Sequence, residues 1–433
     1  MLFHNFLNYI DPGTGSMLFA IIIGVVTAGI FVVRGLFIKF KFFLQGGRGK
    51  QEDLKKSTCV IFSDSKTYWN IFKPVCDEFE RRGVDCQYLT ASKDDPALEE
   101  KYEHVKCEFV GEGNMAFAKL NMMSAVICLS TTPGLDVLQW KRSKDVECYI
   151  HIFHGIYDAT VYRMFGLDHY DVVLMTGEFQ REQIRAMEQM RNYPVKELEV
   201  AGVTNLDSLM ERLNKEGRKH NEKRTVLLAP SWGDACILNK YGAEFIQKLI
   251  NTGYKIIIRP HPQTKTVDPE MLKSLMEQFP DNENLSWNFD IDNFDCLNES
   301  DILISDYSGV VFDYAFVFDG PIMYADTTFQ YEVYDAAWFE GPTWLLSTLP
   351  KIGRQLKQED FDNMKEIIDE VIDSEEYKAG RNAARDEAWQ ERGKATKNIV
   401  DYVIKKHDEL VAAAEQKAQE ASQKKSGLFG KKK

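Results

Sequence analysis

The sequence predicts an α/β protein made of two domains, each built around a parallel β-sheet. Apolar runs of strand length alternate with amphipathic helical patterns along most of the chain, which is typical of βα units. This alternation stops at a polar, charged stretch, 211–224, and then starts again. We therefore expect one domain at 57–215 and a second at 222–406. A chain of 433 residues is long enough for two such domains.

The first half contains apolar runs that we interpret as buried strands of one sheet. Three amphipathic patterns, at 69–82, 115–123 and 178–189, predict helices between them. The predicted strands are 57–62, 86–90, 106–110, 124–130, 147–153, 170–177 and 196–202.

The second half repeats this organisation. We expect strands at 224–230, 254–260, 301–305 and 321–326, with helices at 243–251 and 269–279 and a further helix after the third strand. Two long amphipathic helices, 359–373 and 383–406, complete the second domain. Beyond them the composition narrows to Ala, Gln, Glu and Lys, which predicts a basic, partly disordered tail at 407–433.

Composition excludes several classes of protein. The formal net charge of −13 argues against nucleic-acid binding, which requires clustered Lys and Arg to neutralise phosphates. The eight cysteines form no C-x-x-C pair, so we expect neither a zinc site nor a disulfide framework. Scattered, unpaired thiols are typical of a reducing compartment such as the cytoplasm.

A membrane anchor is predicted near the N-terminus. Residues 17–33 carry no charge, and the apolar character continues to 38, so we expect a transmembrane helix at 17–38 after a short segment, 1–16. A cleaved signal peptide is disfavoured because the first sixteen residues contain no Lys or Arg. The basic linker at 39–56 predicts a single-pass membrane protein with its catalytic body on the cytoplasmic face. The basic tail could add contact with anionic lipid.

Candidate site residues follow three of the predicted strands. Ligands of open parallel sheets bind at the carboxyl ends of the strands, so polar residues at those positions are candidates for chemistry. His154 and Gly155 follow the strand at 147–153, whereas His151 lies inside it and is more typical of a structural histidine. Arg259 and His261 follow the strand at 254–260 and could present a cationic cluster to a phosphate.

The third strand end is DILISDYSGVVFDYA, at 301–315. Free N–H groups at the start of its predicted helix, together with hydroxyls, could bind an anion, although plain helix capping is the simpler alternative. Asp313 lies seven residues after Asp306, two turns along the same helix face, and could bind a ligand hydroxyl or pair with a basic neighbour. The candidate residues of this segment are Ser305, Asp306, Ser308, Gly309 and Asp313.

These motifs resemble the CDP-glycerol glycerophosphotransferases, the primases and polymerases of wall teichoic acid. The resemblance covers roughly 57–400 and rests on FHG (153–155), LLAPSWG (227–233), RPHP (259–262) and SDILISDYSGVVFDYA (300–315). Two departures are Tyr157, in a place where the family usually has Pro, and Gly309, where it usually has a second Ser.

The resemblance implies a GT-B arrangement, in which two Rossmann-like domains face each other across a cleft and the C-terminal domain holds a CDP-polyol donor. It implies that His154 and His261 are the important histidines, with His154 as general base and His261 acting on the diphosphate. Arg259, Ser305, Asp306, Ser308 and Gly309 would bind donor phosphate. Further candidates for donor or acceptor contacts are Gly155, Ser231 and Asp313.

The implied reaction transfers glycerol phosphate or another polyol phosphate to a cell-wall polymer or a lipid-linked acceptor, with release of CMP. We expect no protein-bound metal or cofactor, although Mg²⁺ could accompany the donor. Two alternatives remain open: a GT-B glycosyltransferase that uses a sugar nucleotide, and a non-catalytic, membrane-anchored binding protein. The polyol, the acceptor, the choice between primase and polymerase, and the oligomeric state do not follow from the sequence.

Overall fold

The computed structural model describes Gly29, Val33 and the ranges 57–327 and 330–429. The predicted segments 1–16, 17–38 and 39–56 lie outside the described residues, except for Gly29 and Val33. The chain divides into two compact units, Met1–Lys55 and Lys56–Lys433, and the second unit contains both predicted domains. In the part of the chain that the structure describes, no helix is both long enough and apolar enough to traverse a bilayer.

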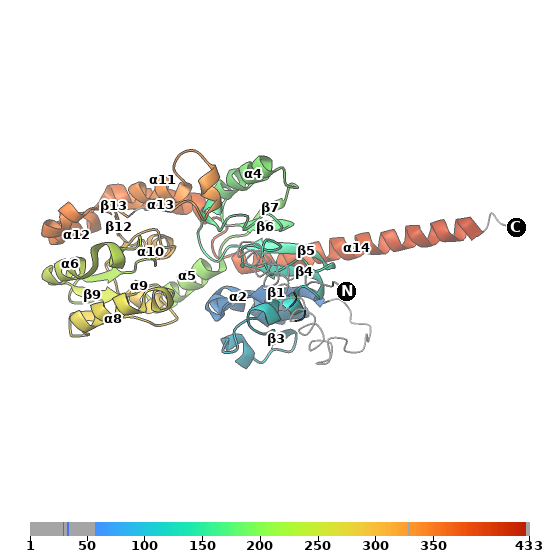
Figure 1. The fold of residues 1–433 in the computed structure, drawn as a ribbon, viewed down its shortest axis with the longest axis horizontal. Helices are drawn as coiled ribbons and strands as arrows, with labels where there is room; N and C mark the ends of the chain where they lie inside the picture. Colours follow the sequence, from blue (N-terminus) through green and yellow to red (C-terminus); the bar gives the residue numbers. More distant parts are fainter. Residues whose placement is uncertain (1–28, 30–32, 34–56, 328–329, 430–433) are drawn as a thin grey trace, which may run out of the picture. The chain divides into compact units, whose positions relative to one another are not determined.

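The first domain is built on a parallel sheet of seven described strands in the order β3-β2-β1-β4-β5-β6-β7 (Figure 1). The order reverses between β1 and β4, as in Rossmann-like sheets. The strands are β1 (Ser57–Ser63), β2 (Cys86–Thr90), β3 (Val105–Phe109), β4 (Ser124–Ser130), β5 (Asp145–Ile152), β6 (Val172–Met175) and β7 (Glu197–Val200). The helices are α2 (Trp69–Arg82), α3 (Asn114–Leu120), α4 (Phe179–Arg191) and α5 (Thr204–Glu216).

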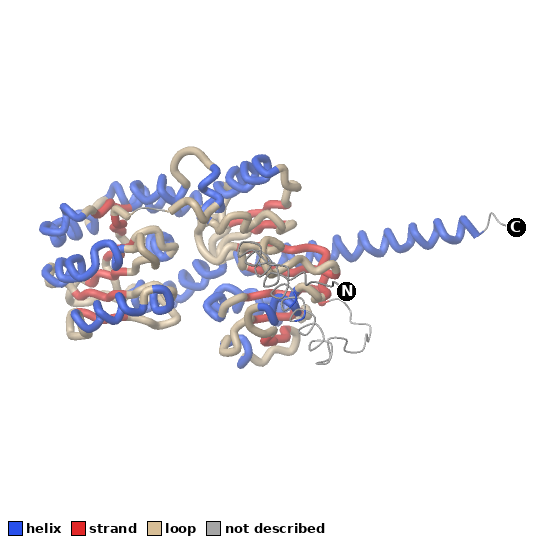
Figure 2. Tube along the Cα trace, in the orientation of Figure 1, coloured by secondary structure: helices blue, strands red, loops and turns tan. Residues whose placement is uncertain are grey.

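The second domain is built on a parallel sheet of six described strands in the order β10-β9-β8-β11-β12-β13, which reverses between β8 and β11. Helices flank its strands (Figure 2). The strands are β8 (Thr225–Leu228), β9 (Lys255–Ile258), β10 (Leu285–Trp287), β11 (Ile302–Ser305), β12 (Ile322–Ala325) and β13 (Gly353–Leu356). The helices are α6 (Ile237–Asn251), α7 (Thr264–Val267), α8 (Pro269–Gln278), α9 (Phe294–Asn298), α10 (Val310–Val317), α11 (Trp344–Ile352), α12 (Met364–Ile372) and α13 (Glu375–Ala388).

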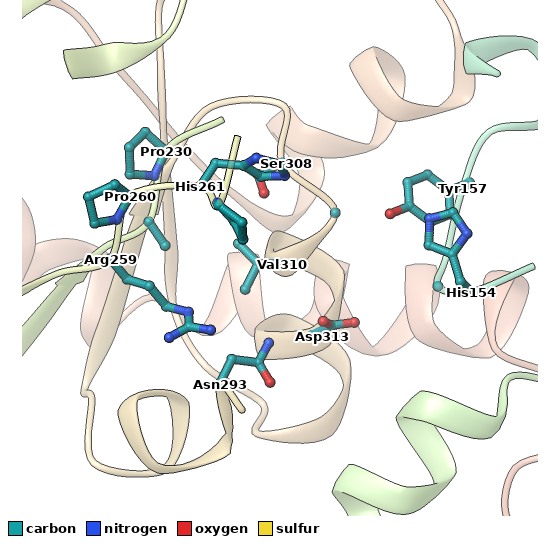
Figure 3. A pocket seen from close by; sticks show the side chains of 14 residues that line it. His154, Tyr157, Pro230, Arg259, Pro260, His261, Asn293, Ser308, Val310 and Asp313 are labelled. Carbon is teal, nitrogen blue, oxygen red and sulfur yellow. The ribbon is translucent and has the colours of Figure 1, made fainter. Parts of the chain in front are cut away.

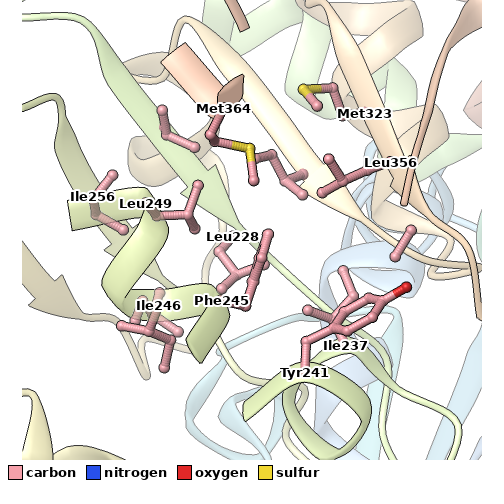
Figure 4. Packing of buried hydrophobic residues seen from close by; sticks show 14 of the residues in the cluster. Leu228, Ile237, Tyr241, Phe245, Ile246, Leu249, Ile256, Met323, Leu356 and Met364 are labelled. Atoms are coloured by element: carbon pink, nitrogen blue, oxygen red, sulfur yellow. The ribbon is translucent and has the colours of Figure 1, made fainter. Parts of the chain in front are cut away.

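The core of the second domain shows why its apolar runs form strands. Leu228 and Ile256 on neighbouring strands are fully buried against Phe245 and Leu249 of α6, while Met364 of α12 packs into the same cluster (Figure 4). The central strands β8 and β11 are buried along their whole length because helices cover both sides of a parallel sheet, whereas the edge strand β13 carries Arg354 and Gln355. Burial of one such apolar side chain stabilises the fold by roughly 1.5–3 kcal/mol.

Several elements were not predicted from the sequence. β10 and β13 are only three and four residues long, and α5 occupies part of the stretch that was interpreted as a polar boundary. Leu206 and Leu209 of α5 are buried against residues of the second sheet, so this helix is amphipathic rather than a linker. The polar residues of α5 outnumber its apolar ones, and the apolar residues recur only every three or four positions. The segment therefore has the composition of a linker although it forms an amphipathic helix.

The C-terminal helical region also differs from the prediction. The expected helix at 383–406 is divided between α13 and α14 (Ala395–Phe429), because Glu391 and Gly393 adopt positive φ angles of 55° and 73°. The segment 407–433, expected as a basic and partly disordered tail, is helical up to Phe429. Ala, Gln, Glu and Lys are strong helix formers, so this composition extends the helix.

The packing of α14 also differs from the predicted boundaries of 57–215 and 222–406. Ile399, Val400 and Val403 are buried in the hydrophobic core of the first domain, not the second. Asp207 of α5 fixes the start of α14, since its carboxylate accepts hydrogen bonds from the backbone N–H groups of Gly393 and Ala395, both at 2.9 Å. Helix α14 therefore packs on the first domain, although it follows the second domain in the sequence.

A buried ion-pair group connects the two domains beside the site. Arg191 of α4 donates to Asp168 at 2.7 Å and also pairs with Asp335, which lies in the segment after β12. Asp335 is fully buried and accepts the backbone N–H of Phe165 at 2.9 Å. A buried charge group of this kind costs desolvation energy and holds its partners in one geometry. We infer that it fixes the spacing of the two sheets where their carboxyl ends meet.

Candidate functional site

The candidate site lies at the carboxyl ends of strands from both sheets: after β5 in the first domain, and after β8, β9 and β11 in the second, where β8 and β11 flank the reversal of strand order. A cavity of about 230 Å³, here called the cleft cavity, has residues from both domains in its wall. His154 and Tyr157 enter it from the first domain, opposite Arg259, His261 and Ser308 of the second (Figure 3). The remaining lining residues are Gly155, Ala229, Pro230, Pro260, Pro262, Asn293, Gly309, Val310 and Asp313.

His154 lies just past the end of β5 and is partly buried. Its Nδ1 atom is 3.0 Å from the hydroxyl of Thr131, a fully buried residue that follows β4. The rings of Tyr68 and Tyr157 lie 5.0 and 4.6 Å from the imidazole, measured between centroids. Burial lowers the pKa of His154 to about 4. The imidazole is therefore uncharged at neutral pH.

His261 is an uncharged hydrogen-bond donor. Its Nδ1 atom accepts the backbone N–H of Gln263 at 3.1 Å, so the proton of the neutral ring must reside on Nε2. Burial, and then the positive charge of Arg259, lowers the pKa of His261 to about 4. Arg259 itself is held by the side chain of Asn288 and by the backbone carbonyl of Asp290. One fixed N–H donor and one cation thus stand side by side.

The start of α10 supplies the anion-binding element of the site. Ser308 and Gly309 precede the helix and line the cleft cavity. The N–H groups of Val311 and Phe312 donate to the carbonyls of Ser308 and Gly309 at 3.1 and 3.0 Å, so the N–H groups of Gly309 and Val310 are the candidate anion donors at this helix start. The preceding residues do not line this cavity. Ser305 donates its hydroxyl hydrogen to the carbonyl of Ala229 at 2.6 Å, and Asp306 accepts the N–H of Ser231 at 2.8 Å. Both are fully buried, so they hold two loops together behind the anion site.

Asp313 lies further along α10, on the wall of the same cavity. Burial raises the pKa of Asp313 to about 7, and a hydrogen bond from the Asn293 side chain partly counteracts this. No Lys or Arg of the described chain forms an ion pair with it. A carboxyl group that titrates near neutral pH inside a cleft is a typical candidate for proton transfer.

A second cavity of about 440 Å³, here called the side cavity, shares Tyr157, His261, Ser308 and Gly309 with the first. Ser231 and Trp232 of the loop after β8 line it, and the Trp232 side chain is 48% exposed. The cleft cavity alone is smaller than the roughly 300–1,000 Å³ of typical small-molecule sites. A donor and an acceptor would therefore need both cavities.

The structure thus brings together most, but not all, of the residues selected from the sequence. His154, Gly155, Arg259, His261, Ser308, Gly309 and Asp313 line one cavity. Ser231 lies in the side cavity, whereas Ser305 and Asp306 lie behind the site. His151 is fully buried between Phe153, Tyr162 and Tyr170, as expected of a structural histidine.

Sequence reasoning gave no role to Thr131, Tyr157 or Asn293. Thr131 directly follows a predicted strand, so its strand-end position is a usable signal, whereas the sequence marks Tyr157 only as a departure from a family pattern. Asn293 lies in an irregular loop, where only the tertiary structure brings it to Asp313. Within the described ranges, no three His, Cys, Asp or Glu side chains are grouped closely enough to hold a metal ion.

Solved structures with a similar fold confirm the two-domain architecture. UDP-GlcNAc 2-epimerase from Neisseria meningitidis, bound to UDP-GlcNAc, matches 80% of this chain and 99% of its own, with 15% identity and a TM-score of 0.51. The epimerase from Methanocaldococcus jannaschii, in complex with UDP-GlcNAc and UDP, has the same coverage, 12% identity and a TM-score of 0.51. At this identity the similarity establishes the GT-B-like fold alone.

The family model named CDP-Glycerol:Poly(glycerophosphate) glycerophosphotransferase matches residues 166–405, which is more than half of the chain. The chain belongs to this family. It is accordingly an enzyme, and membership implies a CDP-glycerol donor and a poly(glycerophosphate) acceptor. No curated protein matches the chain significantly. The matched range includes Arg259, His261 and α10 but begins after His154, so the family match does not reach the first-domain side of the cleft.

Proposed function

We propose that this glycerophosphotransferase transfers a glycerol-phosphate unit, or another polyol phosphate, from a CDP-activated donor to a cell-wall polymer or a lipid-linked acceptor, and releases CMP. The observation that carries the proposal is the cleft cavity. It places a cation, a fixed N–H donor and a helix start on one side, in a chain that belongs to the family. These are the groups that a diphosphate requires.

In the proposed reaction, an acceptor hydroxyl attacks the β-phosphorus of the donor in line with the departing CMP oxygen. Phosphoryl transfer depends mainly on positioning and on stabilising the charge of the phosphoryl oxygens. Arg259 would neutralise charge on the diphosphate, while Nε2–H of His261 and the N–H groups at the start of α10 would bind its oxygens. Such preorganised donors are worth about 10²–10³-fold each in rate.

His154 is proposed to act from the opposite domain. Its imidazole lines the same cavity as the anion-binding groups, and it is uncharged at neutral pH. An uncharged imidazole can accept one hydrogen bond and donate another at the same time. We propose that it contacts either the attacking hydroxyl or an oxygen of the transferred phosphate.

Membrane attachment remains part of the proposal. It rests on the uncharged run at 17–33 and on the basic residues that follow it. The test introduces single cysteines on either side of this segment, in a cysteine-free background, and treats intact cells with a membrane-impermeant thiol reagent. Cysteines before residue 17 should react, and cysteines after residue 38 should not. Labelling after residue 38 from the outside would contradict a cytoplasmic catalytic body.

The decisive assay measures the release of CMP and identifies the product by mass spectrometry. The protein is incubated with CDP-glycerol, CDP-ribitol or a panel of UDP- and GDP-sugars, each with a lipid-linked or polymeric acceptor. Release of CMP that depends on the acceptor, with a mass increase of one polyol phosphate, supports the proposal. Transfer from a sugar nucleotide alone would favour a glycosyltransferase, and binding without turnover would indicate a binding protein.

A further inference from the structure

Two groups in the cleft cavity could take the proton of the attacking hydroxyl, and they differ in their surroundings. His154 comes from the first domain and Asp313 from α10 of the second, and both line the same cavity (Figure 3). In Figure 3 the Asp313 carboxylate lies between the Arg259 and His154 sides of the site. A general base works best when its pKa is close to the operating pH.

His154 is poorly equipped to be that base. A catalytic histidine usually has a carboxylate or carbonyl behind it that fixes the tautomer and stabilises the imidazolium. In the described chain the partner of Nδ1 is the Thr131 hydroxyl, and no carboxylate contacts the ring. The rings of Tyr68, Tyr157 and Tyr162 surround it, and burial lowers the pKa of His154 to about 4.

The contact with Thr131 also indicates where the imidazole proton lies. Thr131 is fully buried, and its hydroxyl has no other described partner. A buried O–H that donates to nothing costs about 1–3 kcal/mol, so the hydroxyl donates to Nδ1 in the stable arrangement. The Nε2 atom then carries the proton. In this tautomer His154 presents a hydrogen-bond donor to the cavity, as His261 does.

Asp313 has the opposite character. Its carboxyl group contacts the amide of Asn293 and lies within electrostatic range of Tyr157. The other charged or titratable groups on the wall of the cavity are His154, His261 and Arg259. Both histidines are uncharged near pH 7, and Arg259 is directed to the loop at 288–291. The carboxylate therefore has no ion-pair partner of its own in the described chain.

We propose that Asp313 is the catalytic base of the transfer and that His154 donates a hydrogen bond to a phosphoryl oxygen. This inference rests on the proposed function. The acceptor oxygen forms a bond to the β-phosphorus, the bond from that phosphorus to the bridging oxygen breaks, and CMP leaves with the electron pair. The proton of the acceptor hydroxyl passes to a carboxylate oxygen of Asp313 and is later lost to water.

This assignment differs from the role expected for His154 from the sequence. The position of Asp313 supports it, because the residue is on the helix whose start is proposed to bind the diphosphate, about one and a half turns from Ser308. Burial raises the pKa of Asp313 to about 7, so the carboxyl group can both hold and release a proton near neutral pH. Helix α10 would therefore supply both the groups that bind the donor diphosphate and the base, Asp313.

The test compares Asp313→Asn with the wild type in single-turnover reactions with CDP-glycerol and saturating acceptor. We expect turnover to fall at least 100-fold in Asp313→Asn, while the Kd values of CDP-glycerol and CMP, measured by calorimetry, stay within threefold. Asp313→Glu should retain part of the rate. The matched control is Glu270→Gln, which removes a carboxylate from the exposed face of α8.

The pH dependence provides the second readout. The wild-type rate should rise about tenfold per pH unit below pH 7 and level off above it. The residual rate of Asp313→Asn should not show this inflection, and Asp313→Glu should move it. If Asp313→Asn does not fold, as judged by circular dichroism, Asp313→Glu and the wild-type profile still test the proposal.

Three outcomes would overturn it. A rise of more than tenfold in the Kd of CMP, with little change in turnover, would mean that Asp313 binds a donor hydroxyl. An inflection near pH 4 that disappears in His154→Ala, but not in Asp313→Asn, would make His154 the base. Full activity of Asp313→Asn would exclude a catalytic role altogether. If the wild type itself releases no CMP from CDP-glycerol, the proposed function fails instead.

Discussion

The hydroxyl of Tyr157 occupies the space that a side chain at Gly309 would need. A Cβ atom built on Gly309 would lie 3.0 Å from Tyr157 Oη and 3.3 Å from the adjacent ring carbon. Tyr157 belongs to the first domain and Gly309 precedes α10 in the second, so this contact joins the two sides of the site. It also lies on the boundary between the cleft cavity and the side cavity, because both residues line both cavities.

We therefore expect Gly309→Ala to displace the Tyr157 ring without unfolding the protein, since the crowded atom is the end of a side chain. Turnover should fall about tenfold or more, because a small misplacement of reacting groups is costly. Tyr157→Phe removes Oη and should restore part of the rate when combined with Gly309→Ala. A double variant that is no better than Gly309→Ala would show that the contact is unimportant.

Substitutions of His154 should separate its two proposed roles. His154→Ala should lower turnover at least tenfold with little change in CDP-glycerol affinity, because the donor is proposed to bind mainly to the second domain. His154→Gln should retain more activity than His154→Ala, since the amide nitrogen of Gln can donate a hydrogen bond from the place of Nε2. Equal loss in both variants, in steady-state assays, would favour proton transfer by His154.

The anion site at the start of α10 predicts a loss of donor affinity in Ser308→Ala. Removal of one hydrogen bond to a charged ligand should cost about 1.5–3 kcal/mol, which is ten- to 100-fold or more in the Kd of CDP-glycerol. Calorimetry measures this directly. Ser274→Ala, on the exposed face of α8, is the matched control. Unchanged nucleotide affinity in Ser308→Ala would place the phosphates elsewhere.

Asp207 predicts a stability effect that is separate from catalysis. Its carboxylate accepts hydrogen bonds from Gly393 and Ala395 and from the indole N–H of Trp389, so Asp207→Ala removes the acceptor of three donors, two of which belong to the buried residues Trp389 and Ala395. We expect the free energy of unfolding to fall by about 1–3 kcal/mol. The midpoint of chemical denaturation, compared with that of the exposed variant Glu415→Ala, provides the measurement. A midpoint unchanged from the wild type would contradict this role.

Asp313 also makes stability depend on pH. Burial raises the pKa of Asp313 from 3.8 to about 7, so the folded protein holds a proton that the unfolded chain has already lost. The contribution is fully present below pH 4 and is lost as the pH rises through 7. Asp313→Asn keeps an uncharged group at this position at every pH. The thermal midpoint of Asp313→Asn, relative to that of the wild type, should therefore increase as the pH rises from 4 to 7. A difference that does not change with pH would contradict the burial of this carboxyl.

The sequence alone determined the class of fold and most of the strands. Parallel strands covered on both faces must be apolar throughout, so runs such as 124–130 and 301–305 were visible without any structure. The three strand ends with His154, Arg259 and Ser308 followed from the same reasoning, because the carboxyl ends of parallel strands meet at one edge. These features depend on residues that are close together in the chain.

Only the tertiary structure decided what depends on residues far apart in the chain. Burial of Ser305 and Asp306, the contact between Thr131 and His154, and the raised pKa of Asp313 all arise from packing between elements. No local pattern shows how much water surrounds a carboxyl group or which hydroxyl faces an imidazole. The sequence therefore identified which groups are present at the site, and desolvation in the folded chain decided which of them can exchange a proton near pH 7.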